Sequence, residues 1–211
     1  VNPCGKDDAK EDKNHLSTAR DMANMARYAM TLPKFREIVI KEWYKDMPQT
    51  DLHDKWGMFK TTNRLLWKTN EYTYDNNGIE YKYTVNGVKT GYTSGAGNNF
   101  LCSAVNENGM ELMVAVMHVK QGNNSVFNYA KELLEYGFKQ YDNQKVSGSD
   151  AIVKTVEVED AKNSESLEIR TKNDFICALP QDRSKWNISS SEKIFYPIKA
   201  PITKGELLGY I

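Results

Sequence analysis

The feature that most constrains the fold of this chain is a set of strand-like stretches near its centre, separated by short turns. The stretches cover residues 81–89, 99–105 and 112–119. Turn-forming Asn, Asp and Gly precede the first stretch at 75–78 and separate the last two at 106–109. A short loop joins neighbouring strands as an antiparallel hairpin, because a parallel crossover needs a longer connection. The sequence therefore predicts an antiparallel sheet.

A helix is predicted before these strands. It begins near Ser17 or Thr18, because Thr18 and Asp21 have the spacing of a capping box. Pro33 is expected to end it, since proline cannot continue a helix. Its apolar residues recur at spacings of three and four and are expected to face the core: Met22, Met25, Ala26 and Ala29. Residues 34–46 fit either a short helix or a strand.

A second helix is predicted over residues 125–141, and the character of the chain changes after it. Its expected apolar side comprises Val126, Tyr129, Leu133 and Leu134. Residues 142–150 resemble a linker and precede short alternating runs bounded by turn residues, at 152–158, 167–170, 175–179, 186–189 and 193–198. We therefore divide the chain into a first domain, residues 1–141, and a β-rich domain, residues 142–211, which we expect to be incomplete.

Composition excludes several classes of protein. The chain has 28 basic and 28 acidic residues, a balance that argues against a nucleic-acid partner. It has no apolar run of about 18 residues, the length that crosses a membrane. The cysteines form no C-x-x-C pair and the histidines no ligand spacing, so neither a metal nor a cofactor is predicted. Cys102 and Cys177 lie in apolar runs and are expected to be buried free thiols.

The run at residues 88–97, V-K-T-G-Y-T-S-G-A-G, carries the chemistry most clearly. A peptide can add as an extra strand along an exposed sheet edge, and Gly91, without a Cβ, lets its backbone approach closely. Thr90 offers a hydroxyl to a terminal carboxylate, and Lys89 offers a positive charge beside the reacting centre. The backbone N–H of Tyr92 is placed to donate to an oxyanion, an interaction worth about 3 kcal/mol in acyl-transfer enzymes. The alternative is an ordinary strand end with a solvated lysine.

Four stretches of the sequence carry a family resemblance: N-P-C-G at 2–5, L-S-T-A-R-D-M-A at 16–23, N-G-V-K-T-G-Y-T-S-G-A-G at 86–97 and L-L-E-Y-G-F at 133–138. In these stretches the chain resembles the low-molecular-mass penicillin-binding proteins, the serine-type D-alanyl-D-alanine carboxypeptidases. Their order and spacing match throughout residues 1–141. The β-rich part that follows resembles the second domain of the family.

The resemblance implies an α+β fold. Its first domain would be transpeptidase/β-lactamase-like, an antiparallel sheet flanked by helices that is incomplete at its N-terminus, and a small all-β sandwich would follow. It implies that a serine attacks the D-Ala-D-Ala bond of a peptidoglycan stem peptide, that β-lactam antibiotics bind, and that the protein is extracytoplasmic, in the cell envelope. Lys89 and the Tyr92 N–H would be catalytic. The residues that would bind substrate are Thr90, Gly91, Thr93 and Arg64.

The chain departs from the family pattern in one decisive respect. The family motifs S-x-x-K and S-x-N lie upstream of the S-T-A-x-D-M-A helix, and only 16 residues precede Ser17. The S-x-x-K at residues 190–193 lies in the β-rich half, and we interpret it as a coincidence. We therefore expect this chain alone to be inactive, with the nucleophile on a companion chain or a lost segment, and any membrane anchor in a segment absent here. A catalytically inactive homologue that binds peptidoglycan peptides stays open. So does a β-lactamase, which the long stretch after Gly91 disfavours.

Overall fold

The computed structural model describes residues 6–7, 10–11, 16–45, 47–54, 56–120, 122, 124–162 and 166–211. The N-P-C-G stretch lies outside the described residues. The chain divides into two compact units, residues 1–139 and 140–211, each of which is described by itself. The sequence had placed the boundary after residue 141. No helix among the described residues has the length and apolar character needed to cross a membrane.

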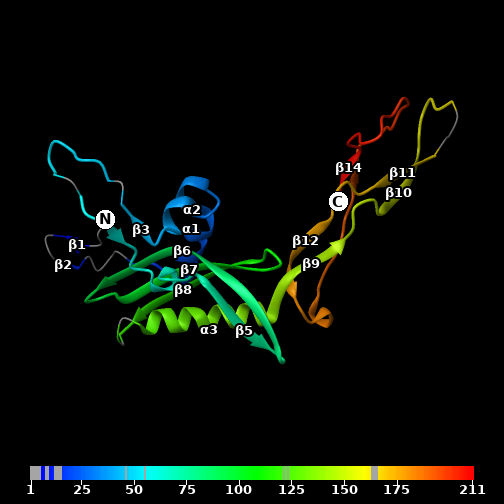
Figure 1. The fold of residues 1–211 in the computed structure, drawn as a ribbon. Coiled ribbons are helices and arrows are strands. Elements are labelled where there is room, and N and C mark those ends of the chain that lie inside the picture. Colours follow the sequence, from blue (N-terminus) through cyan, green and yellow to red (C-terminus); the bar gives the residue numbers. More distant parts are fainter. Residues whose placement is uncertain are drawn as a thin grey trace. The chain divides into compact units, whose positions relative to one another are not determined.

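The first unit is built on a four-stranded antiparallel sheet with the strand order β5-β6-β7-β8 (Figure 1). Its strands are β5 (Glu71–Asn76), β6 (Ile79–Thr93), β7 (Gly97–Asn106) and β8 (Glu111–Val119). Asn77 and Gly78 join β5 to β6 with φ of 57° and 84°, values that Asn and Gly adopt most readily. The sheet that the turn residues predicted is confirmed. β6 is longer than expected, because its pairing with β7 continues to Thr93.

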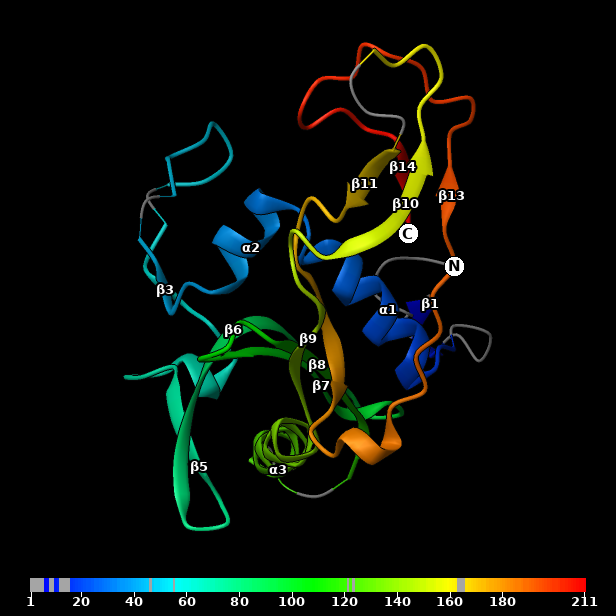
Figure 2. The ribbon, with the colours of Figure 1, turned by 90° about the vertical axis from the view of Figure 1, so that its right-hand side faces the viewer.

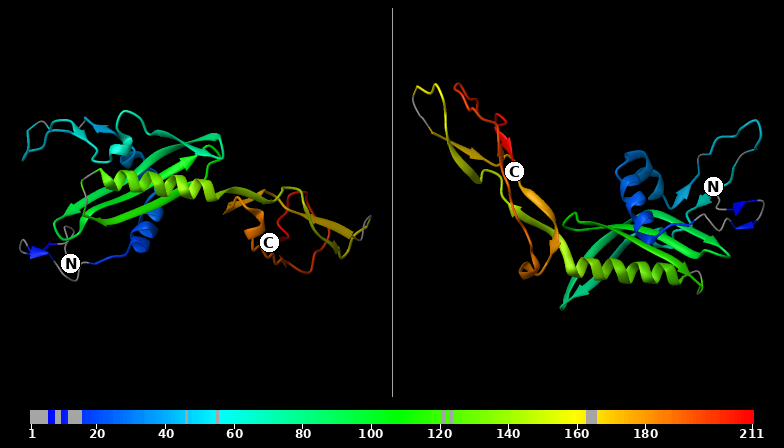
Figure 3. Two further views of the ribbon diagram at one scale, coloured as in Figure 1. Left: turned by 90° about the horizontal axis from the view of Figure 1, so that it is seen from below. Right: turned by 180° about the vertical axis from the view of Figure 1, so that it is seen from behind.

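Helix α3 (Ser125–Gln140) covers one face of this sheet, as seen end-on in Figure 2 and from below in Figure 3. Its buried residues are Val126, Phe127, Ala130, Leu134 and Phe138. Two residues predicted to face inward do not, since Tyr129 is 39% and Leu133 46% exposed. The helix lies so close to β8 that a Cβ on Gly137 would come within 2.6 Å of a Leu112 methyl carbon. A side chain at this position would therefore require the Leu112 side chain to shift.

Helices α1 (Ala19–Ala29) and α2 (Pro33–Val39) pack on the other face of the sheet, α1 against β8 and β7 and α2 against β6 (Figure 1). The predicted cap is confirmed: the Thr18 hydroxyl accepts a hydrogen bond from the Asp21 N–H at 3.1 Å. Pro33 does not end α1 but begins α2. The first turn of a helix suits proline, because the N–H that proline lacks has no partner there.

The apolar face of α1 is only partly buried. Ala26 is 3% exposed and Met30, just beyond the helix, is 4% exposed. Met22 and Ala29 are half-buried. Met25 was predicted to lie in the core but is 57% exposed. The helix therefore buries a narrower stripe than its apolar sequence suggested.

A hydrogen-bonded cluster ties α2 to the sheet. Arg36 Nη2 lies 2.6 Å from the Glu111 carboxylate, which also accepts hydrogen bonds from Ser103 Oγ at 2.8 Å and Asn86 Nδ2 at 2.9 Å. Burial raises the pKa of Glu111, but the hydrogen bonds from Arg36, Ser103 and Asn86 outweigh it, so the pKa lies below its ordinary value. The carboxylate is therefore charged at neutral pH and links three strands, β6, β7 and β8, to helix α2.

The shorter elements before β5 are two-stranded ladders and one helical turn. They are β1 (Lys6–Asp7) with β2 (Lys10–Glu11), β3 (Trp43–Tyr44) with β4 (Phe59–Lys60), and the 3-10 helix η1 (Arg64–Leu66). The two interpretations of residues 34–46, a short helix and a strand, each hold for part of the segment. The segment begins within α2 and ends just beyond β3.

The second unit consists of three two-stranded antiparallel ladders and the 3-10 helix η2 (Arg183–Lys185). The ladders pair β9 (Tyr141–Ser147) with β12 (Phe175–Pro180), β10 (Ile152–Glu157) with β11 (Ser166–Arg170), and β13 (Lys193–Ile194) with β14 (Gly209–Tyr210). The expected linker at 142–150 is mostly strand, because β9 finds a partner in β12. The run at 186–189 is not a strand. Together the two units have an α+β fold.

The two described cysteines differ in burial. Cys102 lies in the core of the first unit with no exposed surface, whereas Cys177 is only half-buried. Neither forms a disulfide. Burial in apolar surroundings raises the pKa of the Cys102 thiol, because the thiolate loses its solvation there. The expectation of a buried free thiol therefore holds fully for Cys102 and partly for Cys177.

Candidate active site

The Lys-Thr-Gly run lies on a part of β6 that has a strand neighbour on one side. β6 pairs with β5 only over residues 79–84, whereas it pairs with β7 from 83 to 93. The edge of β6 that faces β5 makes one further backbone hydrogen bond at Val85, whose N–H donates to the Asn70 carbonyl at 2.8 Å. Beyond Val85, within the described part of the chain, no strand pairs with this edge. Unpaired strand edges are where an extended peptide can add by backbone hydrogen bonds.

Lys89 and Thr90 project to opposite faces of the sheet, because side chains alternate along a strand. Thr90 is paired with Phe100, whose ring packs on Phe127 of α3 at 4.9 Å between centroids, so Thr90 belongs to the α3 face. Lys89 is exposed on the face that α1 and α2 share, and its ammonium group donates to the Thr90 carbonyl oxygen. At Gly91 a Cβ would meet no described atom within 4 Å. The glycine thus leaves open space beside the edge.

The segment before β5 is attached to β6 next to the Lys-Thr-Gly run. Asn63 is 2% exposed, and its Nδ2 donates to the Gly87 carbonyl at 3.1 Å. Its Oδ1 accepts the Leu65 N–H at 3.0 Å, which caps η1. One residue earlier, the Thr62 hydroxyl lies 2.5 Å from the Thr90 hydroxyl. Sequence reasoning missed both residues. A polar residue before a short apolar turn signals a cap at Asn63, but no sequence signal marks Thr62.

Arg64 begins η1 and is directed toward the start of α3. Its guanidinium donates to the Asn124 side-chain oxygen and lies 5.3 Å from the centre of the Trp67 ring. The Lys60 ammonium lies 4.0 Å from the centre of the same ring. The indole N–H of Trp67 donates to the Thr61 carbonyl at 2.8 Å, which fixes the ring. Arg64 follows Thr62 and Asn63, which contact β6, but its own guanidinium contacts Asn124.

The turn that follows the Lys-Thr-Gly run is held by several side chains. The Thr93 hydroxyl accepts the Ala96 N–H at 3.0 Å, and a ring nitrogen of His118 lies 3.1 Å from the Ala96 carbonyl. Asn99 Nδ2 donates to the Gly97 carbonyl at 2.9 Å. Thr93, predicted to bind substrate, thus also shapes the turn, and His118 supports it. These hydrogen bonds therefore fix the backbone on the C-terminal side of Tyr92. The Tyr92 side chain is 68% exposed.

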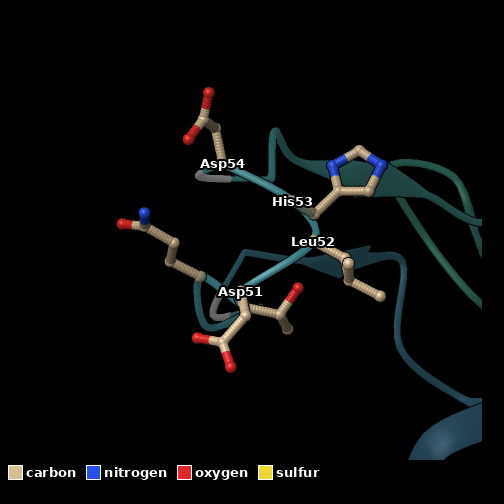
Figure 4. Close-up of a pocket in the computed structure, with 6 residues that line it drawn as sticks. Asp51, Leu52, His53 and Asp54 are labelled. Carbon is tan, nitrogen blue, oxygen red and sulfur yellow. The ribbon is translucent and has the colours of Figure 1, made fainter.

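A surface concavity lies elsewhere, in the loop between β3 and β4. It is lined by six consecutive residues, 49–54, and the side chains of Asp51, Leu52, His53 and Asp54 point in different directions (Figure 4). The His53 ring is stacked on the Trp56 ring, with 3.8 Å between the ring centroids. Across the described ranges, no group of three or more His, Cys, Asp or Glu residues is placed to hold a metal ion. We assign no site to this loop.

Comparison with known proteins identifies the family. Residues 1–121, more than half of the chain, match the family described as D-alanyl-D-alanine carboxypeptidase. The chain belongs to the D-alanyl-D-alanine carboxypeptidase family. A curated relative, D-alanyl-D-alanine carboxypeptidase DacA of Haemophilus influenzae, is 27% identical over 206 residues, which are 95% of this chain and 46% of the relative. The resemblance found in the sequence is therefore confirmed.

Solved structures of penicillin-binding proteins share the fold. Penicillin binding protein 5 from Haemophilus influenzae matches with a TM-score of 0.58 and 25% identity, over 95% of this chain and 52% of that protein. PBP3 from Streptococcus pneumoniae, described as a peptidoglycan synthesis regulatory factor, matches with a TM-score of 0.62 and 22% identity, over 96% of this chain and 53% of that protein. The chain thus spans about half the length of each of these proteins.

Proposed function

We propose that this chain forms the substrate-binding edge of a serine-type D-alanyl-D-alanine carboxypeptidase. The observation that carries the proposal is the Lys-Thr-Gly run on an unpaired edge of β6, in a chain of this family. The substrate would be a peptidoglycan stem peptide ending in D-Ala-D-Ala, in the extracytoplasmic cell envelope. β-Lactam antibiotics would bind at the same place. No cofactor is part of the proposal.

In the proposed complex, the end of the peptide adds to the free edge of β6 as a short strand. The Thr90 hydroxyl donates to the terminal carboxylate, and Gly91 leaves room for the peptide backbone. The Lys89 ammonium contributes positive charge beside the reacting bond, and the Tyr92 N–H donates to the oxygen that becomes negative in the transition state. Thr93 and Arg64 are additional candidates for substrate contacts, and the Arg64 guanidinium donates a hydrogen bond to Asn124.

The proposed reaction is acyl transfer in two steps. A serine hydroxyl attacks the carbonyl of the penultimate D-alanine, its proton passes to the leaving amine, and the peptide C–N bond breaks to release D-alanine. Water then hydrolyses the ester and regenerates the serine. We propose that this serine lies on a polypeptide segment outside these 211 residues, on a companion chain or a segment of the same protein. A β-lactam would acylate the same serine and stay attached.

A second candidate function is peptide binding without catalysis. It is favoured by the position of the S-x-x-K at residues 190–193, which belongs to the second unit, whereas Lys89 belongs to the first. Ser190 is exposed outside any strand, and Lys193 begins the short strand β13. Among the residues that the structure describes, none is placed as a base to activate the Ser190 hydroxyl.

Release of D-alanine distinguishes the two functions. The chain is incubated with a D-Ala-D-Ala-terminated peptide alone, and again together with a polypeptide that carries the family S-x-x-K and S-x-N segments. We expect no release from the chain alone and release with serine-dependent kinetics from the combination, with a Ser-to-Ala partner polypeptide as the control. A combination that binds the peptide and forms a stable complex, yet releases no D-alanine, would favour the binding protein.

A further inference from the structure

Thr62 lies outside β6, and its side chain contacts the Lys-Thr-Gly run. Its hydroxyl oxygen lies 2.5 Å from that of Thr90, and either atom can be the donor. Thr62 is exposed and Thr90 is half-buried. The pair therefore lies at the surface, beside the free edge of β6, where a ligand can reach it. The family resemblance assigned no role to Thr62.

The two hydroxyl groups form a short hydrogen-bond chain. Each carries one proton and can accept further hydrogen bonds, so a bond between them uses one proton and leaves the other. When Thr62 donates to Thr90, the Thr90 proton is free to donate to a third group. Linked hydrogen bonds of this kind polarise and strengthen one another. A carboxylate suits the free proton best, because it only accepts hydrogen bonds and carries a full negative charge.

The backbone around Thr62 is fixed on both sides. The Thr61 N–H donates to the Glu42 carbonyl at 2.9 Å, and the Thr61 carbonyl accepts the indole N–H of Trp67 at 2.8 Å. On the other side, the buried Asn63 amide donates to the Gly87 carbonyl of β6 at 3.1 Å. Thr62 therefore meets Thr90 from a preformed position, and little conformational entropy is lost when a ligand binds.

We propose that Thr62 is a positioning residue that orients the Thr90 hydroxyl as a donor to the C-terminal carboxylate of a peptide bound at the β6 edge. The inference rests on the proposed function and adds to it a residue that selects peptides with a free carboxyl end. The selection follows from the hydrogen-bond count: a C-terminal amide is neutral and brings donors of its own, so it gains less from an oriented hydroxyl.

The main test compares two peptides and four proteins, and a double-mutant cycle adds Thr90→Val and the Thr62→Val/Thr90→Val double variant. One peptide ends in D-Ala-D-Ala with a free carboxylate, and the other has the same sequence with a C-terminal amide. Each is titrated into the isotopically labelled 211-residue chain and its Thr62→Val, Thr62→Ser and Thr73→Val variants, and affinity is read from amide chemical shifts. Valine keeps the shape of threonine and removes the hydroxyl, serine keeps the hydroxyl, and Thr73 is an exposed threonine on β5 of the same sheet.

We expect Thr62→Val to weaken binding of the carboxylate peptide about 3- to 10-fold, in the range of one neutral hydrogen bond, and to leave the amide peptide unchanged. Thr62→Ser and Thr73→Val should both bind like the unaltered chain. Thr62→Val combined with Thr90→Val should weaken the carboxylate peptide less than the product of the two single effects, because both remove one shared interaction.

Each other outcome overturns a distinct claim. Equal weakening of both peptides by Thr62→Val would show a structural role and overturn the positioning role, as would an unchanged preference for the carboxylate peptide. If the unaltered chain does not prefer the carboxylate peptide, the proposed function itself fails at this edge and the role of Thr62 fails with it. Where Thr62→Val loses the native amide spectrum, Thr62→Ala takes its place and the same peptide comparison decides.

Discussion

Replacing Lys89 with alanine should slow acylation by labelled penicillin about 100- to 1,000-fold when the chain is combined with the serine-bearing segment. The size of the effect is that of removing one preorganised charge or donor from an acyl-transfer site. Lys89 is exposed on β6, and within the described part of the chain its ammonium group donates a hydrogen bond to the Thr90 carbonyl of the same run. Its removal should therefore cost catalysis and not folding. The rate of covalent labelling, followed on a gel over time, measures it.

Lys82 provides the matched control for this experiment. It is an exposed lysine on the same strand, in the part of β6 that pairs with β5. Lys82→Ala removes the same charge from the protein and should leave the acylation rate within about twofold, because the charge lies far along the strand and is screened by solvent. Equal rates for the Lys89→Ala protein and the unaltered protein would contradict the assignment of the site.

Replacing Leu134 with alanine should lower the free energy of unfolding of the first unit by about 2–5 kcal/mol, the range for a leucine removed from a close-packed core. Leu134 has no exposed surface and lies on the stripe of α3 that packs against the sheet. The loss combines the burial of the side chain with the cavity that remains. Chemical denaturation followed by tryptophan fluorescence and by circular dichroism measures the change, and both signals are needed because the chain has two units.

Leu133→Ala is the matched control for Leu134→Ala, because it makes the same substitution at the adjacent position of α3. Leu133 is 46% exposed, and Leu133→Ala should change the free energy of unfolding by less than about 0.5 kcal/mol. The two variants have identical composition and the same helix propensity at adjacent positions. Equal destabilisation by both would mean that α3 does not meet the sheet through the stripe that contains Leu134.

The sequence predicted the parts of the fold that depend on near neighbours. The Thr18–Asp21 cap and the Asn77-Gly78 turn are set by residues within one turn of chain, so local chemistry was enough to find them. The antiparallel sheet followed from such turns. The Lys-Thr-Gly run was visible for the same reason, because its residues are consecutive.

The parts that sequence reasoning missed depend on contacts between distant residues. The sequence predicts a linker at β9, because its polar residues form a strand through pairing with β12, which is distant in the chain. Leu133 and Leu134 are adjacent and equally apolar, so the pattern alone could not say which of them α3 buries. The contact between Thr62 and Thr90 joins residues 28 apart in the chain, and threonine at an exposed position gives no sign of its partner. The sequence thus predicted the candidate-site residues that lie on β6. It did not predict Thr62, which contacts β6 from another part of the chain.

Mapping where a peptide binds tests the central claim most directly. β8 is also an edge strand of the sheet, so it offers an internal alternative to the free edge of β6. When a D-Ala-D-Ala-terminated peptide is titrated into the labelled chain, we predict that the largest amide shifts fall on residues 88–93 of β6 and on Thr62. Shifts centred on residues 111–119 of β8, with residues 88–93 unchanged, would contradict the account.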